Sequence, residues 1–205
     1  MIPKKWVLVT GAPRSGTTFV GSVLSFPREV DYIHEPFNPE CGMRGIKTRY
    51  LYTRGGAESG AEVDFWISRL LAYRFTLQTA QYPGNTLLRG WVKRVIGGRG
   101  VNYFRLARVN PFSEYALVKD PFACLLPEYL ARAHGIKTLA LIRHPVAFVA
   151  GVRRMKWDPN KGLHAIAAKP ELIEDYFAGE EDLLKPEANM VRSAVGSGAR
   201  SIRLS

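Results

Sequence analysis

The sequence predicts an α/β protein whose central sheet is mostly parallel. Short apolar runs are typical of strands that are covered on both faces, and segments with the period of an amphipathic helix alternate with them. Because parallel strands need a crossover connection, usually a helix, this alternation indicates βαβ units. The predicted strands are Trp6–Thr10, Val30–Ile33, Tyr115–Val118 and Lys137–Ile142.

Helices are predicted where apolar residues recur every three or four positions. Thr17–Phe26 is the first, and its apolar face is expected to pack inward. A long helix begins near Val63 and fails before Pro83. Pro127–Ala133 starts with proline and is followed by glycine, and the last predicted helix begins at Pro145. The residues expected on apolar faces are Phe19, Val20, Val23, Leu24, Val63, Trp66, Ile67, Leu70, Leu71, Val149, Val152 and Met155.

The length and composition fit one folded domain. The chain has 205 residues, of which 46% are hydrophobic and 23% charged, and this composition excludes a disordered tail protein. We expect a single α/β domain over residues 1–189. Small residues without a consistent period dominate the end of the chain, so we expect a poorly ordered tail over 190–205.

The charge balance favours an anionic partner. Lys and Arg total 29 against 18 Asp and Glu, which gives a formal net charge of +11. Phosphates, acidic glycans, nucleic acid and membrane surfaces all fit that charge. Cys41 and Cys124 form neither a zinc pattern nor a disulfide framework, so we expect a reducing, cytoplasmic environment and no metal. No apolar run approaches the ~18 residues of a membrane-spanning helix.

Gly11–Thr18, with the sequence Gly-Ala-Pro-Arg-Ser-Gly-Thr-Thr, follows a predicted strand and opens a predicted helix. In this context free backbone N–H groups and the helix dipole favour an anion, and glycine lets the main chain approach it. The spacing matches G-x-x-x-x-G-K-[ST], except that Thr17 stands where that pattern has the Lys that reaches the terminal phosphates. The loop therefore favours a 5′-phosphate that carries one further group, with Arg14 as the nearby cation.

A second candidate anion site lies near Arg143, which follows a predicted strand and precedes the helix that begins at Pro145. A fixed cation and free helix N–H groups would converge there. The alternative is an arginine that only ties down the helix start through surface ion pairs. Two anion sites in one α/β sheet would suit a bisphosphorylated nucleotide.

These motifs resemble those of the sulfotransferases that use 3′-phosphoadenylyl sulfate (PAPS). Pro13–Thr18, after an apolar strand, resembles their 5′-phosphosulfate loop, and Leu141–Gly151 resembles the segment that binds the 3′-phosphate. Between them, Lys119-Asp120-Pro121 resembles a turn of the carbohydrate-type and bacterial members. The three elements occur in the order of the family, over roughly residues 1–155.

The resemblance implies a three-layer sandwich of the P-loop NTPase-like sulfotransferase fold. It also implies transfer of a sulfuryl group from PAPS to a hydroxyl or amine of a small molecule, glycan or lipid, with peripheral membrane contact as an option. Arg14 would neutralise charge at the sulfuryl group, and Arg143 would hold the 3′-phosphate. The residues expected to hold the 5′-phosphate are Ser15, Gly16, Thr17 and Thr18.

The sequence departs from the family pattern in two places. Gly151 stands where the family usually has a Ser whose hydroxyl holds the 3′-phosphate, so a backbone N–H, Arg153 or Arg154 replaces it or donor affinity is weakened. Residues 190–205 contain no counterpart of a later basic loop over the adenine. A truncated, catalytically weak PAPS-binding homologue is therefore one alternative. A P-loop phosphotransferase is another, opposed by the missing Lys, and Asp120 would be its candidate Mg²⁺ carboxylate.

The segment Ile33-His34-Glu35-Pro36-Phe37 follows the second predicted strand, where the resemblance implies the catalytic base. Transfer to a hydroxyl needs a group that removes the acceptor proton. Neighbours on an extended segment point to opposite sides, so we expect only one of His34 and Glu35 to face the donor. Glu-Pro-Phe is the commoner family pattern, which favours Glu35 as the base. The non-catalytic interpretation is that Glu35 is an ion-pair partner of Arg14.

Residues 65–113 contain no acidic residue but carry eight Lys and Arg side chains. A solvated basic face is the favoured interpretation. An acceptor cleft for an anionic glycan, a lipid head group or RNA is the alternative, although nothing in the stretch resembles a nucleic-acid motif and no nucleic-acid partner is expected. The basic residues are Arg69, Arg74, Arg89, Lys93, Arg94, Arg99, Arg105 and Arg108.

Overall fold

The computed structural model describes residues 4–55, 60–78, 98–155, 157–158, 160–180 and 184. The chain divides into two compact units, residues 1–141 and 142–205, and each is described by itself. The expected boundary between a domain over 1–189 and a tail over 190–205 lies outside the described residues and stays a prediction.

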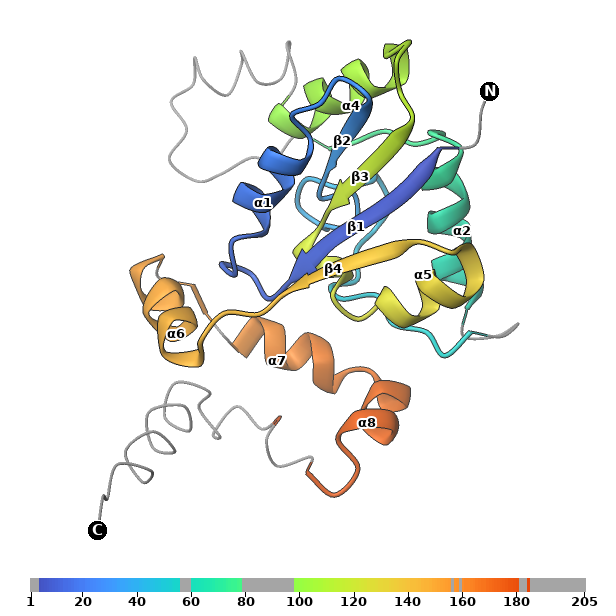
Figure 1. Cartoon of the computed structure of the whole chain (residues 1–205). Helices are drawn as coiled ribbons and strands as arrows, with labels where there is room; N and C mark the ends of the chain where they lie inside the picture. Colours follow the sequence, from blue (N-terminus) through green and yellow to red (C-terminus); the bar gives the residue numbers. More distant parts are fainter. Residues whose placement is uncertain are drawn as a thin grey trace. The chain divides into compact units, whose positions relative to one another are not determined.

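A four-stranded sheet forms the centre of the first unit (Figure 1). Its strand order is β2-β3-β1-β4, and every pairing is parallel. The mostly parallel sheet predicted from the apolar runs is therefore confirmed, and each predicted strand end lies within one residue of the observed one. The strands are β1 (Lys5–Gly11), β2 (Val30–His34), β3 (Tyr115–Lys119) and β4 (Lys137–Leu141).

Because the strands are parallel, their carboxyl ends lie along one edge of the sheet. Lys119 at the end of β3 is paired with His34 on one side and with Val9 on the other. Gly11 at the end of β1 is paired with Leu141 of β4. The chain leaves β1 towards β2 on one side and later places β4 on the other side. Ligands of open parallel sheets bind outside the strand ends at such a reversal.

Helices cover both faces of this sheet. Val20 of α1 packs on the face formed by Val9, Tyr32 and Leu117. Helices α2 and α5 contribute to the larger core on the other face, and α4 packs along the edge strand β2. The helices of the first unit are α1 (Thr17–Leu24), α2 (Ala61–Leu71), α4 (Arg99–Val109) and α5 (Pro127–His134), and a 3-10 turn, η1, spans Pro121–Ala123.

The orientation of α1 differs from the one predicted from its apolar face. Phe19 and Val23 are 75% and 56% exposed, whereas Thr17 and Gly21 are buried. Gly21 is packed so closely that a Cβ there would lie 3.0 Å from Cγ of Lys119. Because the loop after β1 fixes where α1 starts, the helix presents its small residues to the sheet and its large apolar residues outward.

The second unit contains three helices among its described residues: α6 (Pro145–Arg154), α7 (Asn160–Ala167) and α8 (Pro170–Tyr176). Helix α6 begins at the predicted proline, and Val149 and Val152 are buried as expected, while Met155 is exposed. Helices α4, α7 and α8 were not predicted, and α2 ends well before Pro83. None of the described helices is long and apolar enough to cross a membrane.

Candidate functional site

The loop from β1 to α1 has a conformation that needs glycine at both ends. Gly11 has a φ of 144°, and a Cβ there would lie 2.2 Å from the Leu141 carbonyl oxygen. Gly16 has a φ of 100° and caps α1 without a side-chain hydrogen bond. Between them, Arg14 also has a positive φ, 73°, and the N–H of Ser15 donates to the Ala12 carbonyl at 3.0 Å. The segment from Gly11 to Gly16 therefore folds into a tight turn that leads directly into the first turn of α1.

This turn has unsatisfied hydrogen-bonding groups that suit an anion. Ser15 Oγ is buried and finds no hydrogen-bond partner within the part of the chain that the structure describes. The first N–H groups of any α-helix lack intrahelical acceptors, and Gly16 has no side chain that could cap those of α1. No acidic residue lies in the first turn of α1. An anion such as phosphate would supply acceptors for both sets of groups, so the loop has the chemistry of an anion site.

The two threonines of the loop differ in exposure. Thr17, in the position of the P-loop Lys, is only 4% exposed and lies in the first turn of α1. Thr18 is exposed. Thr17 thus occupies space beside the sheet, where a lysine would have to displace its neighbours, and Thr18 is accessible to a ligand.

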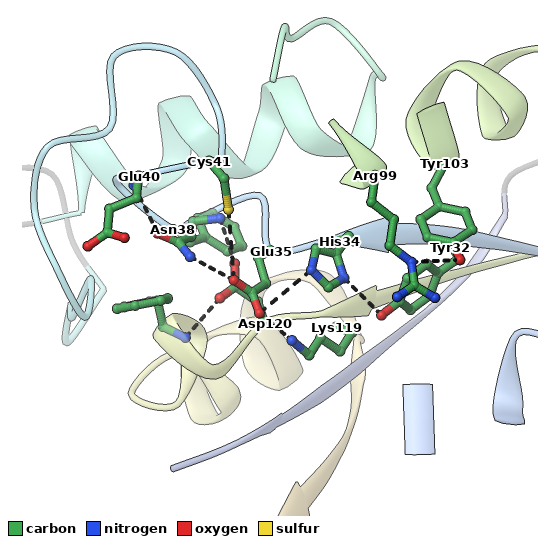
Figure 2. Close-up of polar contacts among 12 residues, drawn as sticks. Tyr32, His34, Glu35, Asn38, Glu40, Cys41, Arg99, Tyr103, Lys119 and Asp120 are labelled. Atoms are coloured by element: carbon green, nitrogen blue, oxygen red, sulfur yellow. Dashed lines mark hydrogen bonds and ion pairs between the residues drawn. The ribbon is translucent and has the colours of Figure 1, made fainter. Parts of the chain in front are cut away.

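The candidate base Glu35 stands at the end of β2, next to His34 (Figure 2). Glu35 has a φ of 48°, in the left-handed region, so the chain turns sharply as the strand ends. His34 Nε2 therefore lies 3.8 Å from Glu35 Oε1. The expectation that the two side chains face opposite sides is wrong, because it assumed an extended backbone at Glu35.

Both carboxylate oxygens of Glu35 have partners. Lys119 Nζ forms an ion pair with Oε1, and the Lys119 side chain is only 2% exposed. Asn38 Nδ2 donates to Oε2 at 2.6 Å, and the Cys41 thiol lies 3.8 Å from the same oxygen. Figure 2 shows the carboxylate enclosed by these groups together with His34. Glu35 thus pairs with Lys119, a cation that the sequence did not suggest for it, and the expected pair with Arg14 stays a prediction.

The surroundings set the charge states of the two neighbours. Burial raises the pKa of Glu35, but the Lys119 ammonium and the hydrogen bonds from Lys119 and Asn38 outweigh that effect and hold the pKa below its usual value. Burial lowers the pKa of His34 to about 4. At neutral pH the site therefore contains a carboxylate beside an uncharged imidazole.

Two tyrosines and an arginine extend the site along β2. The hydroxyl of Tyr32 lies 3.0 Å from His34 Nδ1, and the Tyr32 ring contacts Tyr103 edge to face with centroids 5.0 Å apart. Arg99, at the start of α4, donates from Nε to the Tyr103 hydroxyl at 3.1 Å. Helix α4 thus brings one arginine of the basic stretch next to the strand that carries the candidate base.

Some of the other basic residues of the stretch 65–113 lie on α4, and others lie outside the described residues. Arg105 and Arg108 are exposed on α4, in keeping with a solvated face. Arg89, Lys93 and Arg94 lie outside the described residues, so the hypothesis of an acceptor cleft built from them stays a prediction.

Asp120 links three segments of the chain by hydrogen bonds, an arrangement called the Asp120 clamp below. Its Oδ2 accepts the N–H of Phe37 at 2.6 Å, and its Oδ1 accepts the N–H of Phe122 at 2.8 Å. Its carbonyl accepts the hydroxyl of Thr10 at 2.7 Å. Burial and the charge of Glu35 raise the pKa of Asp120 to about 8, although its two backbone donors act the other way. A carboxylate whose oxygens are taken up in this way is a poor candidate for the Mg²⁺ ligand of a phosphotransferase.

The residues predicted for the 3′-phosphate belong to the second unit. Arg143 lies two residues beyond β4, and the helix that follows it has His144 as an N-cap without a side-chain hydrogen bond. Gly151 is buried within α6. Their roles at the 3′-phosphate stay predictions.

Comparisons of the chain with models of known protein families, with curated proteins and with solved structures found no match. Inference about function therefore depends on the motifs and on the geometry of the strand ends. No chemical role was predicted for Lys119, which was placed only in the Lys119-Asp120-Pro121 turn, or for Asn38, Cys41 and Tyr32. The available signal for Lys119 was a charged residue at the end of a buried apolar run.

Proposed function

We propose that the protein is a PAPS-dependent sulfotransferase that acts on a hydroxyl or amine of a small-molecule, glycan or lipid acceptor. One observation carries the proposal: a carboxylate paired with a buried lysine stands at the same sheet edge as a phosphate loop that lacks the P-loop Lys. Neighbouring strands are about 4.8 Å apart, so Glu35 at the end of β2 stands roughly 10 Å across the sheet from β1. A sulfuryl group on a loop-bound 5′-phosphate would span part of that distance.

The phosphate loop supplies the donor site in this proposal. Ser15, Gly16, Thr17 and Thr18 surround the 5′-phosphate with N–H and hydroxyl donors, and the unsatisfied Ser15 Oγ is the clearest support. Arg143 and the free N–H groups at the start of α6 hold the 3′-phosphate, and Arg153 or Arg154 replaces the usual serine, because the Gly151 N–H lies inside the helix. Such charge-assisted hydrogen bonds are the strong ones in proteins.

The bound donor supplies the sulfuryl group and leaves as adenosine 3′,5′-bisphosphate. The acceptor oxygen forms a bond to sulfur while the bond from sulfur to the 5′-phosphate oxygen breaks, and the electron pair of that bond goes to the phosphate. Glu35 takes the proton that the acceptor loses. Arg14 and Lys119 stabilise the negative charge that gathers on the sulfuryl and phosphate oxygens.

The environment favours Glu35 over His34 as the proton acceptor. Nδ1 of His34 already contacts the Tyr32 hydroxyl, whereas Glu35 is a carboxylate at neutral pH; the pKa values of both groups are lowered, so the geometry is what favours Glu35. When Lys119 moves towards an anionic donor, the proton affinity of Glu35 rises, because the cation that lowers its pKa is drawn away. His34 then packs against the base and limits its rotation.

A catalytically weak nucleotide-binding homologue is the second candidate, and Gly151 favours it because glycine lacks the hydroxyl expected at the 3′-phosphate. It would bind the same nucleotide without turnover. A P-loop phosphotransferase is less well supported, since Thr17 replaces the Lys and the oxygens of Asp120 are occupied.

The proposal is tested by measuring the melting temperature with adenosine 3′,5′-bisphosphate and with ATP plus Mg²⁺ in the same buffer. The bisphosphate is expected to stabilise the protein far more, and a ligand at 100 times its Kd adds about 2.7 kcal/mol. Equal or greater stabilisation by ATP would exclude a sulfotransferase. Transfer of labelled sulfate from PAPS to a panel of alcohols and amines then separates the enzyme from the weak homologue.

A further inference from the structure

Asn38 uses both ends of its side-chain amide at the candidate site. It lies in the loop after β2, is 7% exposed, and donates from Nδ2 to Glu35 Oε2 at 2.6 Å (Figure 2). Its Oδ1 accepts the backbone N–H of Glu40 at 2.9 Å. The chemistry of the neighbours fixes this orientation, because an N–H group needs the amide oxygen and a carboxylate needs the amide NH₂.

The two oxygens of Glu35 are therefore held in different ways. Oε1 contacts the charged Lys119, while Oε2 receives a neutral hydrogen bond from Asn38. If Lys119 turns to an anionic donor, Asn38 remains as a contact that keeps the carboxylate in place. A neutral donor orients a base with less loss of proton affinity than a cation causes.

We propose that Asn38 is a positioning residue that anchors Oε2 of Glu35, so that Oε1 is left to take the proton of the acceptor. The inference rests on the proposed sulfotransferase function. It assigns Asn38 no contact with substrate, and its effect passes entirely through Glu35.

The competing explanation is that Asn38 only folds its own loop. Its backbone N–H donates to the Glu35 carbonyl at 3.2 Å, and its carbonyl accepts the N–H of Gly42 at 2.6 Å. The bond from the Glu40 N–H to Oδ1 is an Asx-type turn, which Asp supports as well as Asn, and Ser more weakly. The amide of asparagine supplies the acceptor for this turn at one end and a neutral donor that reaches Glu35 at the other, which neither Asp nor the shorter Ser does. Replacements at this position can therefore separate the two roles.

Asn38→Asp and Asn38→Ser form a matched pair. Both retain an oxygen that can accept the Glu40 N–H, so the loop should persist. Asp removes the donor to Oε2 and adds a negative charge beside it, whereas Ser is shorter and withdraws the donor from Oε2 without adding charge. The other titratable or charged groups that act on Glu35 and its neighbours stay the same in both variants; they are Lys119, His34, Cys41, Glu40, Asp120, Tyr32 and Arg99.

The direct test is the titration of the Glu35 carboxyl by NMR with side-chain-labelled Glu, assigned by its loss in Glu35→Gln. The Asn38 hydrogen bond lowers the pKa of Glu35, so the pKa is expected to rise in Asn38→Ser and to rise further in Asn38→Asp. In turnover, the acidic limb of the pH profile should move upward in the same order. The kcat at pH 7 should fall by about ten- to a hundredfold while the KM for PAPS stays close to that of the parent.

A titration of Glu35 in Asn38→Asp that matches the parent would overturn the proposal and leave Asn38 with the loop role alone. The same conclusion follows if Asn38→Asp keeps the parent's pH profile and kcat. If the Glu35 titration shifts as expected but the parent chain transfers no sulfate, the contact is confirmed and the sulfotransferase assignment is overturned. The NMR titration thus distinguishes a wrong role for Asn38 from a wrong assignment of the sulfotransferase function.

Discussion

Lys119 and Glu35 are joined through both their side chains and their backbones, at the ends of two neighbouring strands. The ammonium forms an ion pair with Oε1, and the N–H of Glu35 donates to the Lys119 carbonyl at 2.8 Å. The exposed fractions of the two side chains are only 2% and 16%. The pair is therefore largely shielded from water, and removing either member leaves a buried charge without its partner.

Lys119→Met should destabilise the protein by about 3–5 kcal/mol at neutral pH, because Glu35 would remain charged and buried without a cation. In the parent, the lowered pKa of Glu35 contributes stability above the unfolded-state pKa, and this contribution is lost as the pH falls through the folded-state pKa. The variant should lose that contribution, so its deficit should shrink at acid pH. Urea unfolding between pH 3 and pH 8 measures the effect, because the lowered pKa of Glu35 places the loss below its usual value of 4.5, and a second substitution, Glu35→Gln, should recover much of the lost stability. A deficit that is constant over this pH range would show that Lys119 acts through packing alone.

Glu35→Gln should lower turnover by about 10²–10⁴-fold, because the amide keeps the shape of the side chain but cannot take the proton. Binding of adenosine 3′,5′-bisphosphate should not weaken, since the change leaves Lys119 free for the nucleotide. The comparison variant is His34→Gln, which should retain most of the activity. If His34→Gln loses activity and Glu35→Gln keeps it, His34 is the base. Calorimetry and a sulfate-transfer assay on both variants provide the measurements.

Arg143→Ala should weaken adenosine 3′,5′-bisphosphate about ten- to a hundredfold and adenosine 5′-phosphate hardly at all. The reason is that only the bisphosphate has a group for the proposed 3′ site. Titration of both nucleotides against parent and variant gives the two ratios. A uniform loss for both would assign Arg143 to the fold or to the 5′-phosphate.

His34→Gln should flatten the acid side of the stability profile. The folded-state pKa of His34 is lowered to about 4 from the usual 6.5, so the folded protein resists protonation. The stability that depends on the neutral imidazole is present above pH 6.5 and is lost as the pH falls towards 4, which corresponds to about 3 kcal/mol. Free energies of unfolding measured at several pH values for parent and variant test the difference. Parallel profiles would mean that His34 titrates normally in the folded protein.

Asp31→Asn should destabilise the fold without changing the site. The Asp31 carboxylate is buried at the start of β2, where it accepts hydrogen bonds from Tyr73, Asn110 and Ser113 at 2.8, 2.9 and 2.6 Å and forms an ion pair with Lys4. The loss is expected to be about 3–5 kcal/mol. The affinity for adenosine 3′,5′-bisphosphate, measured well below the melting temperature, should match that of the parent. A matching loss of affinity would show that the two edges of the sheet are coupled.

The sequence predicted the strands well and the side-chain arrangement poorly, for physical reasons. Buried parallel strands appear as continuous apolar runs, which local pattern reveals directly, so Tyr115–Val118 was found within one residue. The side of α1 that packs inward depends on tertiary structure, here the close approach of Gly21 to Lys119. The positive φ of Glu35 has no signal in a residue type that rarely adopts it.

The pairing of Lys119 with Glu35 was missed for a related reason. Lysine is almost never fully buried unless it is paired, and its partner Glu35 is 84 residues away in sequence. The loop over Gly11–Thr18, by contrast, is local: Gly11 and Gly16 carry both the conformation and the motif within a few residues. The conformation of a short segment such as this loop could be predicted from the sequence. A side-chain contact between distant segments, such as Lys119 with Glu35, could not.

The Asp120 clamp has a consequence for the order of folding. Its bond to Thr10 links residues 110 apart, and its bond to Phe37 links residues 83 apart. Contacts of such long range form only after the entropy of closing large loops has been overcome, which slows their formation. During synthesis, a nascent chain that has not reached residue 119 carries the glycine loop and Glu35 but neither Lys119 nor Asp120. Glu35 can therefore form its ion pair with Lys119 only after β3 has been translated.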